Sequence, residues 1–361
     1  MLFHHLDTPC LIVLPEHVEY NIAEMVRMAG DVKRLRPHVK THKTAEGIRM
    51  MQATGIDTFK CATIAEGELL GMEKAVDVIL AHQPVGPKLE RLLNLINTYP
   101  ATTYSTITDN IDSANEISHF FSAHNLSIGI YIDINVGMNR TGVRAEEALD
   151  LYHVLKSASG IDFKGLHVYD GQHRQSDPLE KEKACDAAFQ PVLDLCDAIV
   201  ALGHDRPKII AGGSPSFSIH ANRPDRYCSP GTNIFWDHNY AGICPEQDFK
   251  HALQILTRVI SKPAPNKICV DLGHKAVAGE NPIDKRVFFP EYPDLKPISQ
   301  SEEHLVLEVQ GENTFKVGDL LIGIPYHVCP TVALHEYLHE VKAGVVTGSW
   351  HVIARKRKIN C

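Results

Sequence analysis

The chain has 361 residues, of which 44% are hydrophobic and 22% are charged, and its formal net charge is −8 with histidine neutral. This length and apolar content predict one large or two moderate globular domains. The acidic balance provides no basic stripe for a phosphate backbone, so we expect no nucleic acid partner. The sequence contains neither an apolar run of roughly 20 residues nor a signal-peptide pattern, which predicts a cytoplasmic protein with no membrane partner.

From about residue 8 to residue 214, short β-rich apolar runs alternate with longer segments of helical spacing. The predicted strands are 9–14, 35–41, 58–62, 76–81, 102–108, 127–135, 161–169 and 208–213. The predicted helices are 15–29, 65–74, 87–97, 113–124, 145–157 and 179–202. This α/β rhythm fits a (β/α)8 barrel better than the alternative, an open doubly wound sheet, because about 210 residues hold seven or eight units.

After about residue 251 the predicted strands follow one another without long helices between them. They are 252–260, 267–271, 305–309, 320–324 and a segment near 341–346, separated by Pro and Gly. This pattern predicts a C-terminal all-β domain. We therefore expect a barrel of residues 8–248 and a β domain made of residues 1–7 and 249–361.

The densest group of polar residues lies where the second predicted strand ends. Alternation along an extended chain would place His38, Lys40 and His42 on one face. A lysine at a barrel mouth, crowded by cations and shielded from water, has a lowered pKa and can attack an aldehyde. The alternative is a solvated basic loop. Polar residues also end later strands, at Asp133 and at the pair His167 and Tyr169.

Two glycine-containing segments could bind an anion. Glycines let backbone amides approach a phosphate closely, and barrels often bind phosphate after their last two strands. The residues are Gly212, Gly213, Ser214, Gly231 and Thr232. The alternative is a pair of ordinary turns.

Two further positions suggest ligands. In an extended segment His327 and Cys329 would point the same way, and imidazole with thiolate suits Zn²⁺. Two protein ligands are too few for a closed structural site, so positions would remain for water or substrate. Arg140, which follows a strand and lies between Gly137 and Gly142, is suited to an oxyanion. The alternatives are chance spacing of a buried cysteine for the pair, and a loop salt bridge for Arg140.

Taken together, these residues resemble the fold-type III pyridoxal-phosphate enzymes of the D-threonine aldolase and D-serine dehydratase group. The resemblance begins at Asp7-Thr8-Pro9 and covers nearly the whole chain. Its most specific motifs are Arg36-Pro37-His38-x-Lys40-x-His42-Lys43 and Pro325-x-His327-x-Cys329-Pro330-Thr331. The family's alanine racemase-like barrel followed by a β domain agrees with the architecture predicted above.

The resemblance implies roles for the candidate residues. Lys40 would form the Schiff base with pyridoxal 5'-phosphate, with His38 beside it, and Arg140 and Tyr169 would lie near the cofactor ring. The phosphate would be bound by Gly212, Gly213, Ser214, Gly231 and Thr232. His327 and Cys329 would hold a divalent metal, for which we expect zinc, with manganese or magnesium as alternatives.

The resemblance leaves the reaction open. D-threonine aldolases carry an Asp where this chain has Cys329, whereas D-serine dehydratases carry the cysteine. The segment from Gly165 to Gly171 is more similar to the aldolase branch. We therefore expect a lyase acting on a β-hydroxy D-amino acid, with retro-aldol cleavage to glycine and an aldehyde ahead of dehydration. A racemase and a non-catalytic pyridoxal phosphate-binding protein are further alternatives, and the resemblance also implies a homodimer.

Overall fold

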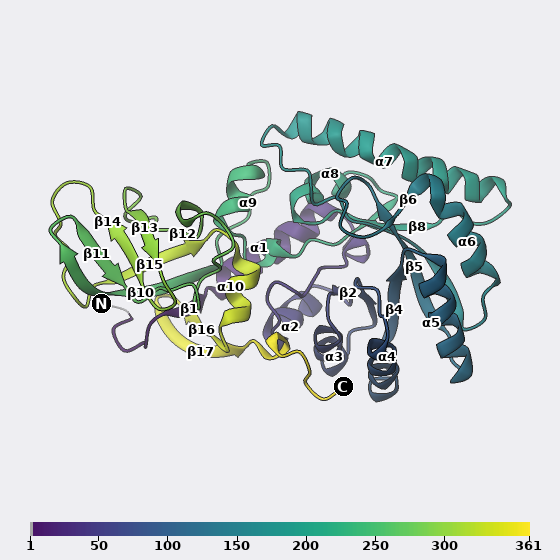
Figure 1. Cartoon of the computed structure of the whole chain (residues 1–361), viewed down its shortest axis with the longest axis horizontal. Helices are drawn as coiled ribbons and strands as arrows, with labels where there is room; N and C mark the ends of the chain where they lie inside the picture. The colour runs from purple at the N-terminus through teal and green to yellow at the C-terminus, as the bar shows by residue number, and fades with distance from the viewer. Residues whose placement is uncertain (1–2) are drawn as a thin grey trace.

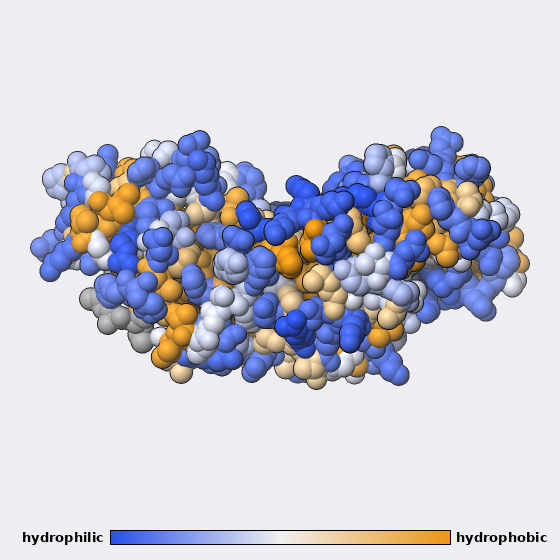
Figure 2. Space-filling view, turned by 90° about the horizontal axis from the view of Figure 1, so that it is seen from below, coloured by the Kyte–Doolittle hydropathy of each residue, from blue (hydrophilic) through white to orange (hydrophobic). Residues whose placement is uncertain are grey.

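The computed structural model describes residues 3–361, so Met1 and Leu2, the start of the segment predicted to join the β domain, lie outside the described residues. The chain forms two lobes, a strand-rich one holding the N-terminal segment and a larger one ringed by helices (Figure 1). One face of the molecule is mostly polar, with scattered apolar residues (Figure 2). Among the described residues no helix combines the length and apolarity that crossing a membrane requires.

The larger lobe contains a parallel sheet in the order β2-β3-β4-β5-β7-β8-β9. Its strands are β2 (Thr58–Cys61), β3 (Asp77–Leu80), β4 (Thr103–Thr108), β5 (Ile128–Asn135), β7 (Ile161–Val168), β8 (Lys208–Ala211) and β9 (Arg226–Cys228), and β6 (Val143–Arg144) pairs with the end of β5. Six of these seven strands coincide with predicted ones. The short strand β9 was not predicted.

Residues 35–38 close this sheet into a barrel. Leu35 bridges to Cys228 of β9, and His38 bridges to Lys60 of β2, both in parallel. The amide of Lys60 donates to the carbonyl of Pro37 at 2.9 Å. The predicted (β/α)8 barrel is therefore confirmed, with this segment as its eighth strand. The extent predicted for that strand was wrong, because the chain leaves the extended conformation after His38 and turns through residues 39–42.

Helices follow the barrel strands and cover them on the outside (Figure 1). They are α1 (Pro15–Ala29), α2 (Ala45–Ala53), α3 (Ile64–Met72), α4 (Pro87–Thr98), α5 (Ile111–Ala123), α6 (Ala148–Ser157), α7 (Pro178–Ala201), α8 (Phe217–Ala221) and α9 (His238–Ile243). Side-chain caps fix several starts: Thr44 accepts from the Gly47 amide, and Thr63 from the Glu66 amide. The sequence did not predict α2, a short helix that begins two residues after the polar group around Lys40.

Short 3-10 turns complete the connections. They are η1 (Val32–Arg34), η2 (Ala145–Glu147), η3 (Ser214–Ser216), η4 (Thr232–Ile234), η5 (Ile283–Lys285) and η6 (Ile353–Arg355). The turn η2 precedes α6, so the helix predicted from residue 145 starts as a tighter turn. The turns η3 and η4 follow β8 and β9, at the end of the barrel where the candidate phosphate-binding residues lie.

The second lobe is a mostly antiparallel sheet in the order β13-β14-β11-β10-β1-β16-β17, in which β15 also pairs with β10, and β12 pairs with β15. Its elements are β1 (Cys10–Val13), β10 (Leu253–Ala264), β11 (Lys267–Val270), β12 (Val287–Phe288), β13 (Lys296–Gln300), β14 (Leu305–Glu308), β15 (Leu320–Pro325), β16 (Tyr337–Lys342) and β17 (Val345–His351), with the helix α10 (Val328–Leu334). The predicted all-β C-terminal domain is confirmed. Residues 341–346, predicted as a strand, instead contain the turn between β16 and β17.

The sequence pattern predicted that residues 9–14 form the first strand of the barrel. This prediction was wrong, because strand β1 belongs to the second sheet. Leu11 pairs with Ile255 of β10 and with Leu338 of β16. The side chains of Leu11 and Val13 join one continuous apolar core with Leu35 and Val39 of the barrel. An apolar run is compatible with a strand in either sheet, so only long-range pairing decides which sheet it joins.

Candidate active site

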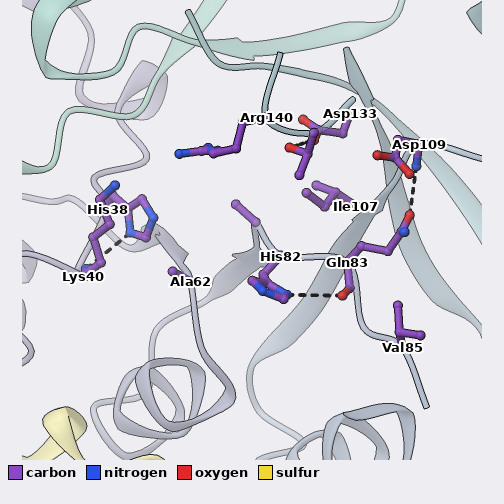
Figure 3. A pocket seen from close by; sticks show the side chains of 12 residues that line it. His38, Lys40, Ala62, His82, Gln83, Val85, Ile107, Asp109, Asp133 and Arg140 are labelled. Atoms are coloured by element: carbon purple, nitrogen blue, oxygen red, sulfur yellow. Dashed lines mark hydrogen bonds between the residues drawn. The ribbon is translucent and has the colours of Figure 1, made fainter. Parts of the chain in front are cut away.

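A cavity of about 490 Å³ opens at the end of the barrel where the parallel strands finish (Figure 3). It is lined by residues from several different strand ends: His38, Lys40, Ala62, Ala81, His82, Gln83, Val85, Ile107, Asp109, Asp133, Arg140 and Thr141. A narrower enclosure adjoins it, lined by His38, Lys40, Lys60, Tyr169, Gly213, Ser214, Ser229, Gly231, Thr232 and Tyr240. His38 and Lys40 line both spaces, so the two spaces lie on either side of these side chains.

Lys40 lies in the turn between the closing strand and α2. The Lys43 amide donates to the Val39 carbonyl at 3.0 Å, and the Lys40 amide lies 3.3 Å from Nδ1 of His38. Within residues 3–361 the Lys40 ammonium group has no hydrogen-bond acceptor, and its Nζ lies 5.9 Å from the centre of the Tyr169 ring. Burial, followed by the charges of Lys40 and Lys60, holds the pKa of His38 well below its usual value. The imidazole of His38 is therefore neutral beside Lys40.

The predicted common face of His38, Lys40 and His42 was wrong. His42 is fully buried on the core side of the turn, where its Nδ1 lies 3.2 Å from Oγ1 of Thr44. Burial lowers the pKa of His42 to about 3. Gly47 of α2 packs on this ring so closely that a Cβ would lie 2.7 Å from Nδ1. A turn, unlike a strand, does not alternate its side chains, so His42 packs in the core while Lys40 lines the site.

Tyr169 follows β7, and its ring is held between two glycines. A Cβ on Gly213 would lie 2.6 Å from Cε2 of this ring, and a Cβ on Gly171 would lie 2.4 Å from its hydroxyl oxygen. The guanidinium carbon of Arg140 lies 4.9 Å from the ring centre. Arg140 forms no ion pair in the described part of the chain, and Figure 3 shows it extending into the cavity toward Lys40. The alternative of a loop salt bridge for Arg140 is therefore excluded.

The candidate phosphate-binding residues come together where η3 and η4 begin. Oγ of Ser214 accepts from the amides of Gly231, at 3.2 Å, and Thr232, at 2.9 Å. The hydroxyl of Ser229 is buried beside them and has no hydrogen-bond partner in the described structure. Gly212 does not line the enclosure. Its φ of +66° and the 2.9 Å separation of a built Cβ from Cβ of His220 show that glycine is needed there by the backbone.

The pair His327 and Cys329 lies at the start of α10, not on a strand as predicted, because β15 ends at Pro325. Sγ of Cys329 lies 3.2 Å from Oγ1 of Thr41 and 3.6 Å from Oγ1 of Thr232. Burial raises the pKa of Cys329, but the hydrogen bond from His327 and the charge of Lys40 more than offset this effect, so the pKa lies below its usual value. The thiolate form of Cys329 is therefore more accessible than that of an ordinary cysteine, beside Thr41 and Thr232.

The partners of His327 stabilise its charged form. Burial lowers the pKa of this imidazole, but the hydrogen bond and negative charge of Cys329, with a hydrogen bond to Glu280, raise it to about 9 overall. A thiolate and an imidazole at one position form a donor set that suits zinc.

A compact group of three ligand-type side chains occurs elsewhere in the described residues, at Asp170, Cys185 and His220.

The sequence did not predict Lys60 as a site residue, and it predicted no role for the nearby His167 and Asp133. Lys60 lies in β2 and is 4% exposed, and its Nζ is 5.8 Å from the Tyr169 ring centre. Nδ1 of His167 lies 2.7 Å from Oδ1 of Asp133. The sequence did hold a signal for Lys60, because this lysine stands between the apolar residues Phe59 and Cys61 of β2. Alternation along a strand places its side chain on the face opposite to Phe59 and Cys61.

Lys40, Tyr169, Arg140 and the segments around Ser214 and Thr232 therefore meet at one end of the barrel. In comparison with known families, residues 13–238 match the model described as "Alanine racemase, N-terminal domain", and residues 252–341 match "Putative serine dehydratase domain". The chain belongs to the alanine racemase N-terminal domain family, a family of pyridoxal phosphate enzymes.

Relatives match over nearly the whole chain. A 3-hydroxy-D-aspartate aldolase of Paracoccus denitrificans is 29% identical, over 97% of this chain and 92% of its own length. A D-threonine aldolase of Arthrobacter is 28% identical, over 97% and 93%. The crystal structure of D-threonine aldolase from Filomicrobium marinum has a TM-score of 0.88 and 28% identity, over 98% and 96%. The expected class, a pyridoxal phosphate-dependent lyase, is confirmed by these matches.

Proposed function

We propose that this protein cleaves a β-hydroxy D-amino acid by a retro-aldol reaction to glycine and an aldehyde, with pyridoxal phosphate and a divalent metal as cofactors. One observation carries the proposal: Thr41, the neighbour of Lys40, contacts Sγ of Cys329 at 3.2 Å. The candidate covalent lysine and the candidate metal ligand therefore share one site, although 289 positions separate them in the sequence (329 − 40). The aldolase names of the relatives support the same reaction.

The residues of the narrow enclosure fit pyridoxal phosphate. The hydroxyl of Ser214, whose oxygen accepts from the amides of Gly231 and Thr232, would donate to its phosphate, and the unpartnered hydroxyl of Ser229 would gain an acceptor there. Lys40 would hold its aldehyde carbon, and Tyr169 would lie against its ring. When bound, the cofactor supplies a covalent attachment for the substrate amine and an electron-accepting ring.

Arg140 binds negative charge in the site, and His38 supports Lys40. The guanidinium of Arg140, free of any carboxylate in the described structure, binds an oxyanion that enters the cavity, either a phenolate or a carboxylate. His38 is neutral, so it can accept a hydrogen bond beside Lys40 without adding positive charge. The Lys40 amine, once released, can take or return a proton at the substrate.

His327 and Cys329 would hold the metal, for which we propose zinc. A metal ion at this pair would lower the pKa of the substrate's β-hydroxyl and so favour loss of its proton. Glu280, which hydrogen-bonds to Nδ1 of His327, fixes the orientation of that ring and leaves Nε2 for the ion. The hydroxyls of Thr41 and Thr232 orient the thiolate in the same way.

Dehydration to a keto acid and ammonia is the second candidate. Cys329 is the residue that D-serine dehydratases carry at this position, and the C-terminal lobe matches the serine dehydratase domain model over residues 252–341. Both reactions use the same site and differ in whether a base takes the hydroxyl proton or the α-proton.

Product analysis tests the proposal. The holoenzyme with Zn²⁺ or Mn²⁺ is incubated separately with D-threonine, both 3-hydroxy-D-aspartate diastereomers and D-serine. We expect glycine with the matching aldehyde from at least one substrate. A keto acid with ammonia as the main products supports dehydration, whereas racemisation without lysis, or no turnover of any of them, contradicts the lyase proposal. Lys40→Ala should lose the cofactor's visible absorbance and all turnover, and the matched control Lys208→Ala, an exposed lysine on β8, should keep both.

The homodimer and the cytoplasmic location that the sequence predicts are part of the same proposal. Light scattering of the purified holoenzyme at several concentrations tests the dimer. A molecular mass that stays at 40.1 kDa, the mass of one chain, would contradict it.

A further inference from the structure

Lys60 is a buried lysine for which the proposed reaction, as described above, has no use. It projects from β2 into the enclosure that Lys40 and Tyr169 also line. Its neighbours Phe59 and Cys61 lie in the apolar core on the other side of the strand. Both lysine amines lie within 6 Å of the centre of one tyrosine ring, at 5.9 Å for Lys40 and 5.8 Å for Lys60. Lys60 therefore reaches the enclosure assigned to the cofactor, next to Lys40, where an amino acid joined to the cofactor would be held.

Behind Lys60 lies a buried hydrogen-bonded pair. Oδ1 of Asp133 lies 2.7 Å from Nδ1 of His167, and its Oδ2 accepts from Thr141 at 2.8 Å. Because Nδ1 of His167 donates to the carboxylate, its Nε2 is the acceptor, and this atom lies 3.5 Å from Nζ of Lys60. The three side chains form a line, carboxylate to imidazole to amine, that ends at the site. The described residues offer Nζ of Lys60 no other hydrogen-bond partner.

The protonation states suit a group that gains and loses a proton near neutrality. Burial, followed by the charge of Lys40, lowers the pKa of Lys60 to about 7. Burial also lowers the pKa of His167, in spite of its hydrogen bond to Asp133. Burial raises the pKa of Asp133, but the hydrogen bonds from His167 and Thr141 more than offset this, so the carboxylate stays ionised.

Other charged groups around Lys60 act in both directions. The charge of Arg140 lowers its pKa, as that of Lys40 does, whereas the carboxylates of Asp133 and Asp170 raise it. His38, on the adjoining closing strand, is neutral and adds no charge.

We propose that Lys60, held by the His167–Asp133 pair, is a second acid–base residue that exchanges a proton with the α-carbon of an amino acid bound beside Lys40. The inference rests on the proposed function only in requiring that the site binds an amino acid next to the cofactor. In the cleavage direction, Lys60 returns a proton to the carbon that loses its Cβ. In dehydration it removes the α-proton.

The proton transfer balances without any further reactant. When the C–H bond breaks, its proton forms an N–H bond on the neutral amine of Lys60, and the electron pair stays on the carbon side. On return, the N–H bond breaks and the pair re-forms the C–H bond. His167 accepts a hydrogen bond from Lys60 throughout and holds the amine in place, so its role is positioning.

Exchange of the glycine α-protons in D2O tests the role of Lys60 apart from carbon–carbon cleavage. The holoenzyme is followed by proton NMR, and we expect the wild-type rate to bend near pH 7. Lys60→Met and Lys60→Arg should each lower it by about 100-fold or more, the usual size of an acid–base contribution. The control Lys208→Met should leave it unchanged. Because arginine keeps the charge but does not release a proton, a wild-type rate in Lys60→Arg would overturn the proposal.

A second readout does not depend on turnover. In protein labelled with ¹³C at lysine Cε, the Lys60 resonance is identified as the one missing from a folded Lys60 variant. In the wild type this resonance should titrate near pH 7, and Asp133→Asn should move that midpoint. A midpoint above pH 9, or an α-proton exchange in Lys60→Met with the wild-type rate and pH profile, would overturn the proposal. A wild-type protein that exchanges no α-proton would overturn it as well. Exchange that depends on Lys60, without cleavage of any β-hydroxy amino acid, would instead overturn the proposed function alone.

Discussion

Oγ1 of Thr41 lies 3.2 Å from Sγ of Cys329, so a residue of the barrel contacts a residue of the β domain 288 positions away in the sequence. Lys40 precedes this threonine, and His327 lies two residues before the cysteine. The contact therefore joins the two most specific motifs of the sequence in one site. We predict that the chemistry at the barrel end depends on the pair in the β domain; three predictions concern residues of this site, and a fourth concerns the buried carboxylate of Asp170.

Replacing Thr41 with valine should weaken metal binding without removing a ligand. The hydroxyl lies beside the Cys329 sulfur, and loss of such a supporting hydrogen bond typically lowers metal affinity about 10- to 100-fold. Competition with a chromogenic zinc chelator measures the change. Thr103→Val, on an exposed position of β4, is the matched control and should bind zinc as the wild type does. Equal affinities in all three proteins would contradict a metal role for this contact.

His327→Ala should remove most of the lyase activity and most of the bound metal. The imidazole supplies one of the two predicted ligands, and its loss leaves a single thiolate. Metal content by mass spectrometry and turnover after chelator treatment check the prediction. The exposed His153→Ala is the control. If the variant and the chelated wild type both keep full activity, the metal has no part in the reaction.

Gly213→Ala should displace Tyr169 and weaken cofactor binding. The added Cβ would lie 2.6 Å from Cε2 of the tyrosine ring, so the ring or the backbone after β8 must shift. Titration of the apoprotein with pyridoxal phosphate should show a loss of affinity of about 10-fold or more, equivalent to about 1.4 kcal/mol. The control is Gly242→Ala, where a Cβ has no atom within 4 Å. An affinity equal to that of the control would show that the tyrosine position is not needed.

The stabilising contribution of the Asp170 carboxylate should be lost as the pH falls from about 4 to about 2. Burial raises the pKa of this carboxyl, but the charge and hydrogen bond of His220, with a hydrogen bond from Ser216, bring it to about 2, below its usual 3.8. Because the folded-state pKa is depressed, its contribution is present above the unfolded pKa and is lost as the pH falls through the folded one. The shift corresponds to about 2 kcal/mol.

Thermal unfolding of the wild type and of Asp170→Asn from pH 6 to pH 2 measures this contribution. The variant should unfold at a lower temperature at pH 6, because His220 and Ser216 lose a buried carboxylate, and the difference should narrow toward pH 2. A difference that stays constant over the whole range would show that the stabilisation does not depend on ionisation.

Several features of the molecule follow from local sequence alone. The alternation of β-rich runs and helical segments predicts the barrel because each unit carries its own periodicity. Lys40, Arg140, Tyr169 and the candidate phosphate-binding segments could be chosen as candidate site residues because parallel strands bring their carboxyl ends to one edge of the barrel. The change after residue 251 predicts the second domain for a similar reason, since strands that follow one another without helices cannot form parallel crossover units.

Tertiary structure decided the rest, because the forces concerned act between residues far apart in the chain. Strand β1 entered the second sheet through its hydrogen bonds with β10 and β16, which an apolar run cannot specify. His42 became part of the core because the chain turns after its bridge to β2, and this turn ended the expected alternation. Lys60 acquired its place beside Tyr169 only when the barrel closed, since burial and the charges from other strands, and not its local sequence, lower its pKa.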